Sequence, residues 1–500
     1  MSLEEKSIWQ VTSDPIASFP MLEGEHEAEV LVIGAGISGL TSAYRLARAG
    51  KRVIVLEARQ VGLGTSGHST GNLYVTVDEH LTRLKKLWGM ETAKAVVQSR
   101  RSAIEWIEET ARMLPVDCGF ERVPFHHFTE NESDSTLRFL DEEAAVAEAV
   151  GIGVESLSRS PLPFKTGRTL RLRDQAQFHP LQYLRGLAAS LPERCQIFEH
   201  SAVIEIDEKR GVAKTARGSV KASVIISATH TPKGVHPVQL KLSPFREHGV
   251  AGELLAGDFP AGIFWRADDP KRSIRKLDVK GKAYVMAIGD RYKTGHNPRN
   301  REAVRELETY LESRASWSGV YTWGAQSYRA ADALPYIGKQ NDHFYFLTGF
   351  SADGLVYGTL GASIIADEIL GKENPWSELY RPKRITPLKS AKTYLKEGTE
   401  NLCAYIKDLP GIGSVSLEQI GKDEGGVIDH QGEKIAVYRD SENTVHAVSA
   451  VCTHLKCIVT FNPEEKTWDC PCHASRFGLD GKVIEGPALR ELEKKDLRGA

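Results

Sequence analysis

Residues 29–40 read Glu-Val-Leu-Val-Ile-Gly-Ala-Gly-Ile-Ser-Gly-Leu, and a second apolar run ends soon afterwards at Glu57. The pattern predicts a buried strand, a glycine turn, a helix and a second buried strand. Gly34 permits the tight turn, Gly36 lets the backbone approach a pyrophosphate, and Gly39 lets helix and strand pack closely. The free N–H groups at the helix start would bind the phosphates, and Glu57 would bind the ribose hydroxyls. The stretch therefore predicts a Rossmann-type dinucleotide site.

A second loop of small residues, Gly-Leu-Gly-Thr-Ser-Gly-His-Ser-Thr-Gly-Asn over 62–72, follows this acid directly. Further segments keep the same order: 177–180 opens a helix, 224–228 is an apolar strand, and 344–354 precedes a helix of small residues. This series, over roughly 28–372, resembles the D-amino acid oxidase superfamily, whose members hold FAD and oxidise C–N bonds. Besides Gly34, Gly36, Gly39 and Glu57, the resemblance implies FAD contacts at Ser66, His68, Thr70, Gly71, Asn72, Val203, Gly349, Ser351, Gly354 and Leu355.

The C-terminal part contains two short motifs that each pair a thiol with an imidazole. They are Cys452-Thr453-His454 and Cys470-Pro471-Cys472-His473. Sulfur is a soft ligand and imidazole a borderline one, so four such groups favour zinc or an iron–sulfur cluster. Zinc fingers usually pair like ligands, whereas one Cys and one His per arm suits a [2Fe–2S] centre with two cysteines and two histidines.

At this point the sequence resembles the Rieske family. The resemblance implies that Cys452 and Cys470 bind one iron, that His454 and His473 bind the other with their rings reaching the surface, and that Cys457 and Cys472 form a disulfide. Lys456 replaces a usual glycine, and Phe477 occupies a position where high-potential members carry a tyrosine. Fewer hydrogen bonds to sulfur predict a lower potential than in those members.

The residues that act on a substrate are harder to predict. In the D-amino acid oxidase superfamily, which this sequence resembles, an antiparallel sheet from inserted segments covers the flavin. The turn with Lys293 and His296 resembles one that some amine oxidases place over the flavin, with a different spacing. Arg329 could bind a carboxylate in a bidentate manner. His230 ends a predicted strand and could act as a base. Each of these residues also has a purely structural alternative, such as a surface contact.

The predicted fold class is an α/β FAD-binding domain with an inserted antiparallel β-sheet domain, followed by an all-β Rieske domain. The expected ranges are an N-terminal extension at 1–27, the FAD-dependent oxidoreductase at 28–375, a linker at 376–410 with a short helix around 390–407, and the Rieske domain at 411–500. Within the oxidoreductase, the FAD part is expected at about 28–74, 166–237 and 323–375, and the substrate part at about 75–165 and 238–322. In the substrate part, residues 134–150 are expected to form a helix, and 245–253 and 282–289 to form strands. Short strands of the Rieske domain are expected at 415–418, 425–428, 433–438 and 444–448.

The bulk numbers agree with a globular protein of several domains. The chain has 500 residues, 41% of them hydrophobic, and a net charge of −2. Such a charge favours no nucleic-acid partner, and no apolar run is long enough to span a membrane. Met1–Gly24 lacks the apolar core of a signal peptide, which predicts a cytoplasmic location. Cys118, Cys195 and Cys403 are expected to be free thiols.

Together these patterns predict an FAD- and Rieske-containing oxidoreductase that oxidises a C–N bond of a small amine or amino acid. Electrons would pass singly from flavin to cluster and on to an acceptor. The expected redox partner is an electron-acceptor or electron-donor protein or a quinone. A non-catalytic electron-transfer protein or a redox sensor is the alternative. A Rieske oxygenase would need two histidines and a carboxylate for a further iron, and no D-x-x-H-x-x-x-x-H pattern is present. RNA modification is disfavoured because no basic face is evident.

Overall fold

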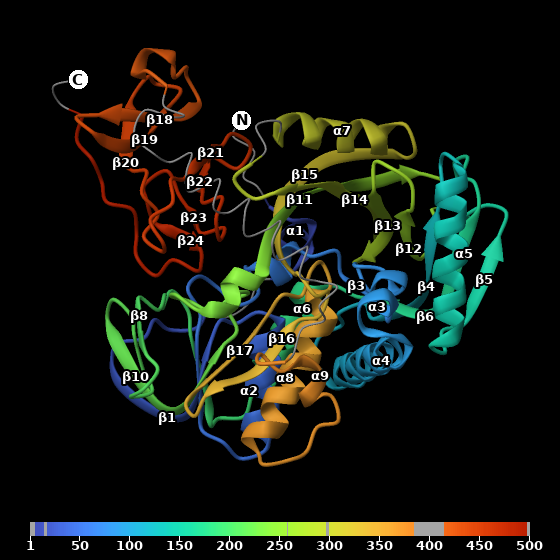
Figure 1. Cartoon of the computed structure of the whole chain (residues 1–500), viewed down its shortest axis with the longest axis horizontal. Helices are drawn as coiled ribbons and strands as arrows, with labels where there is room; N and C mark the ends of the chain where they lie inside the picture. The colour runs from blue at the N-terminus through green and yellow to red at the C-terminus, as the bar shows by residue number, and fades with distance from the viewer. Residues whose placement is uncertain (1–5, 15–17, 258, 297–299, 385–414, 498–500) are drawn as a thin grey trace.

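The structure is a computed structural model that describes residues 6–14, 18–257, 259–296, 300–384 and 415–497. The described part consists of an N-terminal unit (residues 6–384) and a C-terminal unit (residues 415–497). The C-terminal unit lies against one end of the N-terminal unit (Figure 1). The predicted helix near 390–407 and Cys403 lie outside the described residues.

The first sheet of the N-terminal unit has the strand order β16-β17-β10-β1-β2-β7, and β8 and β9 extend it beside β10. Its strands are β1 (Gly24–Ile33), β2 (Val53–Leu56), β7 (Cys195–Phe198), β8 (Glu205–Asp207), β9 (Val212–Lys214), β10 (Gly218–Ser227), β16 (Tyr336–Asn341) and β17 (Phe344–Thr348). The central pairs β1–β10, β1–β2, β2–β7 and β10–β17 are parallel. This is the sheet predicted from residues 29–57.

The apolar run of β1 is continuous because both faces of the sheet are covered. Val30 and Val32 face one core together with helices α2 (Ile37–Arg48) and α8 (Gly354–Ile369). Leu31 and Ile33 face the opposite core. Helices α2 and α8 contact each other on their side of the sheet (Figure 1). Helix α6 (Pro180–Ala189), which was predicted to follow residues 177–180, contacts α2 as well.

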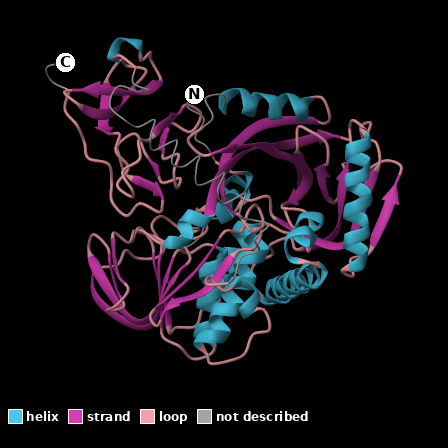
Figure 2. Ribbon diagram, in the orientation of Figure 1, coloured by secondary structure: helices cyan, strands magenta, loops and turns pink. Residues whose placement is uncertain are grey.

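The second sheet contains the predicted insertion, with strand order β15-β11-β14-β13-β12-β4-β6-β3 and β5 beside β6. Its pairs are antiparallel as predicted, except that β12 and β4 are parallel. Its strands are β3 (Asn72–Leu73), β4 (Glu121–Phe128), β5 (Val154–Leu157), β6 (Thr169–Gln177), β11 (Leu242–Ala256), β12 (Ile263–Arg266), β13 (Arg272–Val279), β14 (Lys282–Lys293) and β15 (Ser316–Ala330). Figure 2 shows it as the larger curved group of strands. Strand β6 falls in a range expected in the FAD part, but its hydrogen bonds to β3, β4 and β5 place it in this sheet.

The remaining helices of the N-terminal unit lie around these two sheets (Figure 2). They are α1 (Ile8–Thr12), α3 (Leu81–Trp88), α4 (Met90–Met113), α5 (Asp134–Ala149), α7 (Asn300–Glu312) and α9 (Ser377–Tyr380). Helix α5 confirms the helix predicted at 134–150, and α7 packs on β11 and β14. Short 3-10 turns are η1 (Thr65–His68), in the small-residue loop, and η2 (Pro237–Lys241), between β10 and β11.

The C-terminal unit contains two small antiparallel sheets, as predicted for an all-β domain. They consist of β18 (Glu424–His430), β19 (Glu433–Arg439) and β20 (Val445–Ser449), and of β21 (Thr460–Asn462), β22 (Thr467–Asp469), β23 (Arg476–Phe477) and β24 (Val483–Glu485). The prediction of a strand at 415–418 was wrong. The 3-10 turn η4 (Leu417–Gln419) stands there, and Ser416 and Gln419 cap it reciprocally, which is typical of a helical turn.

Candidate functional site

The predicted nucleotide turn lies where the carboxyl ends of β1, β2 and β10 meet. The Gly34 N–H donates to Leu56 O over 2.8 Å, and the Ala228 N–H donates to Ile33 O over 2.9 Å. Gly34 has φ 103°, and a Cβ there would lie 2.5 Å from Ala228 O. A Cβ at Gly39 would lie 1.8 Å from Gly34 O. The close packing at both positions therefore requires glycine.

The groups beside this turn suit a dinucleotide. Helix α2 starts after Gly36 with no side-chain cap and no acid in its first turn, so it favours an anion. The Glu57 carboxylate accepts from Ala35 N–H at 2.8 Å and from Arg59 N–H at 2.9 Å, which holds it at the sheet edge. Val203 is buried in the core on that side. These residues fit the FAD that the resemblance implies.

The second predicted FAD-contact loop is tied to α2 and to the second sheet. Ser66 Oγ accepts from Ile37 N–H at 3.1 Å. The Arg275 guanidinium donates to Thr70 O at 2.9 Å and to Asn72 Oδ1 at 3.1 Å. Because Arg275 belongs to β13, the loop is held between the nucleotide turn and the sheet that was predicted to cover the flavin.

His68 and Gly71 are predicted FAD contacts whose backbones have structural partners. Trp323 Nε1 donates to His68 O at 2.9 Å, and His68 Nδ1 lies 2.8 Å from Gly64 O. Burial lowers the pKa of His68, which favours the neutral ring. Gly71 has φ 69°, and its carbonyl accepts from Phe178 N–H at 3.1 Å. The loop is therefore a fixed surface.

The third predicted FAD segment is the turn before α8. Gly349 and Ser351 have φ 79° and 53°, in the left-handed region. Gly354 is the first residue of α8, and Leu355 is buried. The start of this helix lies beside the loop that follows β3, because Asp78 N–H donates to Asp353 Oδ2 at 3.0 Å.

Asp78 and Glu79 are charged site residues that the sequence reasoning missed. Together with Arg83, Arg291 and Arg329 they form what we call the junction cluster, between the turn before α8 and the second sheet. Arg291 donates to both Asp78 oxygens, at 3.0 and 2.8 Å. Glu79 accepts from Arg329 Nη2 at 2.6 Å and also contacts Arg83. The available signal was two adjacent acids directly after the apolar run 73–77.

The junction cluster touches a predicted FAD-contact residue and is close to charge balance. Ser351 Oγ donates to Glu79 Oε1 over 3.4 Å. Burial raises the pKa of Glu79 to about 7, although the Arg329 guanidinium opposes this. Arg291 also bonds Glu247 at 2.8 Å. The predicted carboxylate-binding Arg329 thus already has a carboxylate partner within the protein.

The four predicted catalytic residues lie in different surroundings. Arg329 lies in the junction cluster. The turn with Lys293 and His296 lies against the C-terminal unit, where a Cβ on Gly295 would be 2.8 Å from the Pro471 Cα. His296 is exposed, with Nδ1 2.9 Å from Thr294 O.

His230, the fourth of them, is located between the small-residue loop and the C-terminal unit. Its Nδ1 lies 3.2 Å from Thr65 Oγ1 and 2.9 Å from Glu485 Oε1. Burial alone would raise the pKa of Glu485, but the contact with His230 and the nearby arginines outweigh it. The pKa of Glu485 is therefore lowered to about 2. His230 therefore contacts both a cofactor loop and the other unit.

The two predicted cluster loops face each other in the core of the C-terminal unit. Cys452 and Cys470 are fully buried. The rings of His454 and His473 are 5.0 Å apart and nearly perpendicular. Nδ1 of His454 and both ring nitrogens of His473 are buried without a hydrogen-bond partner among the described residues. Two buried thiols beside two imidazoles with unsatisfied nitrogens fit the predicted cluster.

The predicted disulfide between Cys457 and Cys472 is present and joins the two loops. Cys118 and Cys195 are free, as predicted. Lys456, which replaces a usual glycine, has φ 65°, a conformation that favours glycine. The loop thus keeps its backbone shape despite the substitution.

The prediction that both histidine rings reach the surface was wrong. His473 is only 8% exposed, and His454 is half-buried with Nε2 3.2 Å from Gln239 Oε1. Gln239 belongs to η2 of the N-terminal unit. The histidines face the N-terminal unit, and this burial depends on tertiary contacts that no local pattern encodes.

Backbone contacts seat the second cluster loop on β15. Tyr328 Oη donates to His473 O at 3.2 Å and to Gly486 O at 3.3 Å. Gln326 Nε2 donates to Ala474 O at 3.2 Å. Ala474 also belongs to the same buried core as the outer face of β1.

A buried charge network crosses the same interface. Glu465 of the C-terminal unit contacts Arg246 of β11, with Nε 3.0 Å from Oε1, and also contacts Arg476. Arg476 donates to Asp469 Oδ1 at 3.0 Å. Burial alone would raise the pKa of Glu465, but the positive charges of Arg246 and Arg476 outweigh this effect and lower the pKa to about 2. The network thus joins the two units through buried charges.

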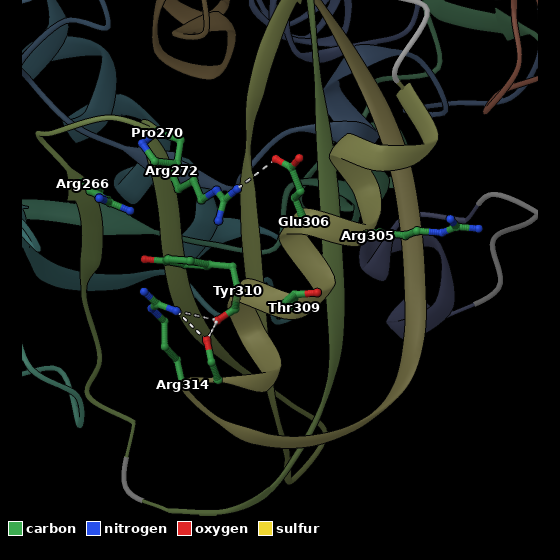
Figure 3. Close-up of a pocket in the computed structure, with 9 residues that line it drawn as sticks. Arg266, Pro270, Arg272, Arg305, Glu306, Thr309, Tyr310 and Arg314 are labelled. Carbon is green, nitrogen blue, oxygen red and sulfur yellow. Dashed lines mark hydrogen bonds and ion pairs between the residues drawn. The ribbon is translucent and has the colours of Figure 1, made fainter.

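The cavity of about 450 Å³ in Figure 3 lies elsewhere, between α7 and strands β12 and β13. Three of its four arginines, Arg266, Arg272 and Arg314, have carboxylate partners. Arg266 and Arg314 contact Glu130, and Arg272 contacts Asp290. The cavity therefore carries little uncompensated charge, and we assign it no ligand.

Among the described residues, no helix combines the length and the apolar character that crossing a membrane requires.

Comparison with known proteins gives two family matches. Residues 29–368 match the family of FAD dependent oxidoreductases named DAO, and residues 415–495 match the Rieske [2Fe-2S] domain. The iron-sulfur protein YhfW of Bacillus subtilis (strain 168), which is named a Rieske 2Fe-2S protein, is 28% identical over 98% of both chains.

Two further similarities concern the N-terminal unit. Gamma-glutamylputrescine oxidoreductase of Escherichia coli (strain K12) is 25% identical, covering 74% of this chain and 90% of that protein. The crystal structure of L-proline dehydrogenase from P. horikoshii has a TM-score of 0.57 at 17% identity and covers 72% of this chain and 98% of that one. The latter shows a shared fold. The chain belongs to the DAO family of FAD-dependent oxidoreductases, carries a C-terminal Rieske domain, and has FAD and a [2Fe–2S] cluster as its cofactors.

Proposed function

We propose that this enzyme oxidises a C–N bond of a small amine or amino acid at FAD and passes the electrons singly to its own Rieske cluster. An electron-acceptor protein or a quinone would then reoxidise the cluster. The observation that carries the proposal is the seating of the second cluster loop on β15, where Tyr328 donates to the carbonyl of the predicted ligand His473. Arg329, the next residue, belongs to the junction cluster beside a predicted FAD contact.

The junction cluster supports an amine as substrate. Its arginines face Asp78, Glu79 and Glu247, so none of these cations is left uncompensated. A substrate with an amino group and no need for a strong carboxylate clamp suits such a site best. The name of the E. coli relative, a gamma-glutamylputrescine oxidoreductase, agrees with this substrate class.

Bound FAD supplies the hydride acceptor, and the residues of the chain supply binding and proton transfer. Glu79, with a pKa near 7, can accept the proton of a substrate ammonium and so produce the neutral amine that oxidation needs. Arg329 and Arg83 orient the Glu79 carboxylate. The second sheet covers the site and excludes water.

The test is anaerobic stopped-flow mixing of the holoprotein with a library of amines and amino acids. We expect at least one amine to bleach the flavin band first and the cluster band afterwards. If an amine reduces the flavin and no amino acid does, the substrate class is amines. If a protein donor alone reduces the cofactors, the alternative of a non-catalytic electron carrier or redox sensor holds. The cytoplasmic location stays a prediction.

A further inference from the structure

We propose that Tyr328 and His230 form the connection through which electrons pass between the FAD site and the Rieske cluster. The inference rests on the proposed function in one respect, namely that FAD and cluster exchange electrons. The inference adds the residues of the route. It also identifies the N-terminal unit of the same chain as the redox partner that the cluster histidines face.

At the cluster end, the connection begins at the backbone of a predicted ligand. Tyr328 Oη donates to His473 O at 3.2 Å and to Gly486 O at 3.3 Å. Gln326 Nε2 lies 3.2 Å from Tyr328 Oη and orients it. Tyr328 is 2% exposed, so its hydroxyl has little competition from water.

At the flavin end, His230 continues the connection. Its ring packs edge-on against the Tyr328 ring with centroids 4.7 Å apart. Its Nδ1 lies 3.2 Å from Thr65 Oγ1, and Thr65 precedes the predicted FAD contact Ser66. Its carbonyl accepts from Thr348 Oγ1 at 2.7 Å, directly before the predicted contact Gly349. His230 therefore touches two of the three segments predicted to hold FAD.

Both units hold His230 in this position. Glu485 of the C-terminal unit lies 2.9 Å from His230 Nδ1. His230 itself has φ 68°, an uncommon conformation for a residue with a side chain, which persists only where surrounding contacts impose it. A chain of hydrogen bonds and one close ring contact thus runs from the FAD loop to the cluster loop. Electrons cross protein faster through such contacts than across empty space.

The electron balance needs no further reactant within the chain. One electron leaves reduced FAD, and one ferric iron of the cluster becomes ferrous. An external one-electron acceptor, a protein or a quinone, then reoxidises that iron before the second electron follows. Two such rounds account for the hydride removed from the C–N bond, and the flavin proton goes to solvent.

The experiment is laser-flash reduction of FAD in the anaerobic holoprotein, with EDTA as the sacrificial donor and no amine present. The flavin and cluster bands are followed separately, and redox titration gives both midpoint potentials. Tyr328→Phe keeps the ring but removes both hydrogen bonds to the cluster side, and we expect transfer roughly tenfold slower. His230→Gln removes the ring contact and should slow transfer by a similar factor. Both potentials should stay unchanged.

Tyr292→Phe is the matched control. Tyr292 is a half-buried tyrosine of β14, and its hydroxyl has no hydrogen-bond partner among the described residues. Wild-type transfer in Tyr328→Phe, equal slowing in Tyr292→Phe, or a rate that rises with protein concentration would overturn the route. Because the flash needs no substrate, failure of the route and failure of the amine-oxidising function are distinguishable. The route can hold when no amine reduces FAD, and an amine can reduce FAD when the route fails.

Discussion

At the scale of single residues, Gly39 illustrates why the nucleotide motif could be read so directly from the sequence. Its Cα hydrogen occupies space next to the Gly34 carbonyl, and a Cβ would lie 1.8 Å from that oxygen. The constraint is local, because both residues belong to one strand–turn–helix segment. Local constraints of this kind leave a recognisable spacing in the sequence.

We expect Gly39→Ala to weaken FAD binding at least about tenfold, because the added Cβ forces the backbone at the nucleotide turn to shift. Such overpacking costs about 1–3 kcal/mol of free energy. FAD content of the purified protein and its fluorescence titration measure the effect. Gly153→Ala, directly before β5 and away from the predicted FAD segments, is the control, since a Cβ there would make only an ordinary contact of 3.8 Å with Arg173 Cβ. Equal FAD loss in both variants would contradict the expectation.

Glu79 represents the opposite case, a residue whose importance is invisible in its neighbourhood along the chain. Its partners Arg329 and Ser351 are more than 200 residues away. Burial raises the pKa of Glu79 to about 7. A carboxyl with a raised pKa binds its proton more tightly in the folded protein, so its stabilising contribution is present below about pH 4.5 and is lost as pH rises through 7.

Glu79→Gln should therefore flatten the pH dependence of stability between pH 5 and 8, whatever its effect on absolute stability. Chemical unfolding of the holoprotein at several pH values measures the slope. Glu25→Gln, an exposed position at the start of β1, serves as the control and should keep the wild-type slope. A slope that is the same in wild type and Glu79→Gln would show that Glu79 is ionised throughout.

At the scale of elements, alternation and spacing located several strands correctly, since β1, β11, β14 and β18–β20 follow the expected ranges. The errors occur where partners are non-local. β6 joined the second sheet because β3, β4 and β5 pair with it. Residues 417–419 form a 3-10 turn because a reciprocal cap outweighs their alternating pattern. Short segments are decided by whichever partner satisfies their backbone.

The two cluster loops form an element of their own, joined by the disulfide Cys457–Cys472 at a sequence separation of 15. A double Cys457→Ser, Cys472→Ser variant should lose about 3 kcal/mol of stability in this unit, because the closed loop restricts the unfolded chain. Thermal loss of the cluster band measures it. Cys195→Ser, a free thiol in β7, should not change that transition; an unchanged transition in the double variant would contradict the prediction.

At the scale of the whole molecule, the two units dock through buried polar contacts as well as apolar packing. Glu465 and Glu485 cross the interface to Arg246 and His230. Both carboxyls have a pKa lowered to about 2. A lowered carboxyl pKa contributes stability that is present above about pH 4.5 and is lost as pH falls through 2. Acid should therefore loosen the interface.

We expect a Glu465→Gln variant to be destabilised by about 3 kcal/mol, because it leaves Arg246 and Arg476 buried without their shared partner. At pH 7, the protection of the amides of residues 323–330 and 470–477 against hydrogen exchange should be lower in the variant than in the wild type. Glu433→Gln, which breaks an exposed pair with Lys495, is the control and should cost less than about 1 kcal/mol. Unchanged exchange in Glu465→Gln would mean that apolar packing alone orients the units.

The sequence by itself determined the cofactors, the families and the order of the domains. The glycine turn, Glu57 and the two Cys–His motifs each act within a few residues of backbone, so their spacing records their chemistry. Only the tertiary structure decided which way His454 and His473 face, that Arg329 already has Glu79 as a partner, and that Tyr328 and His230 lie between the small-residue loop and the C-terminal unit. Those relations join residues that are far apart along the chain, and close packing and the pairing of buried charges, rather than any local pattern, bring them together.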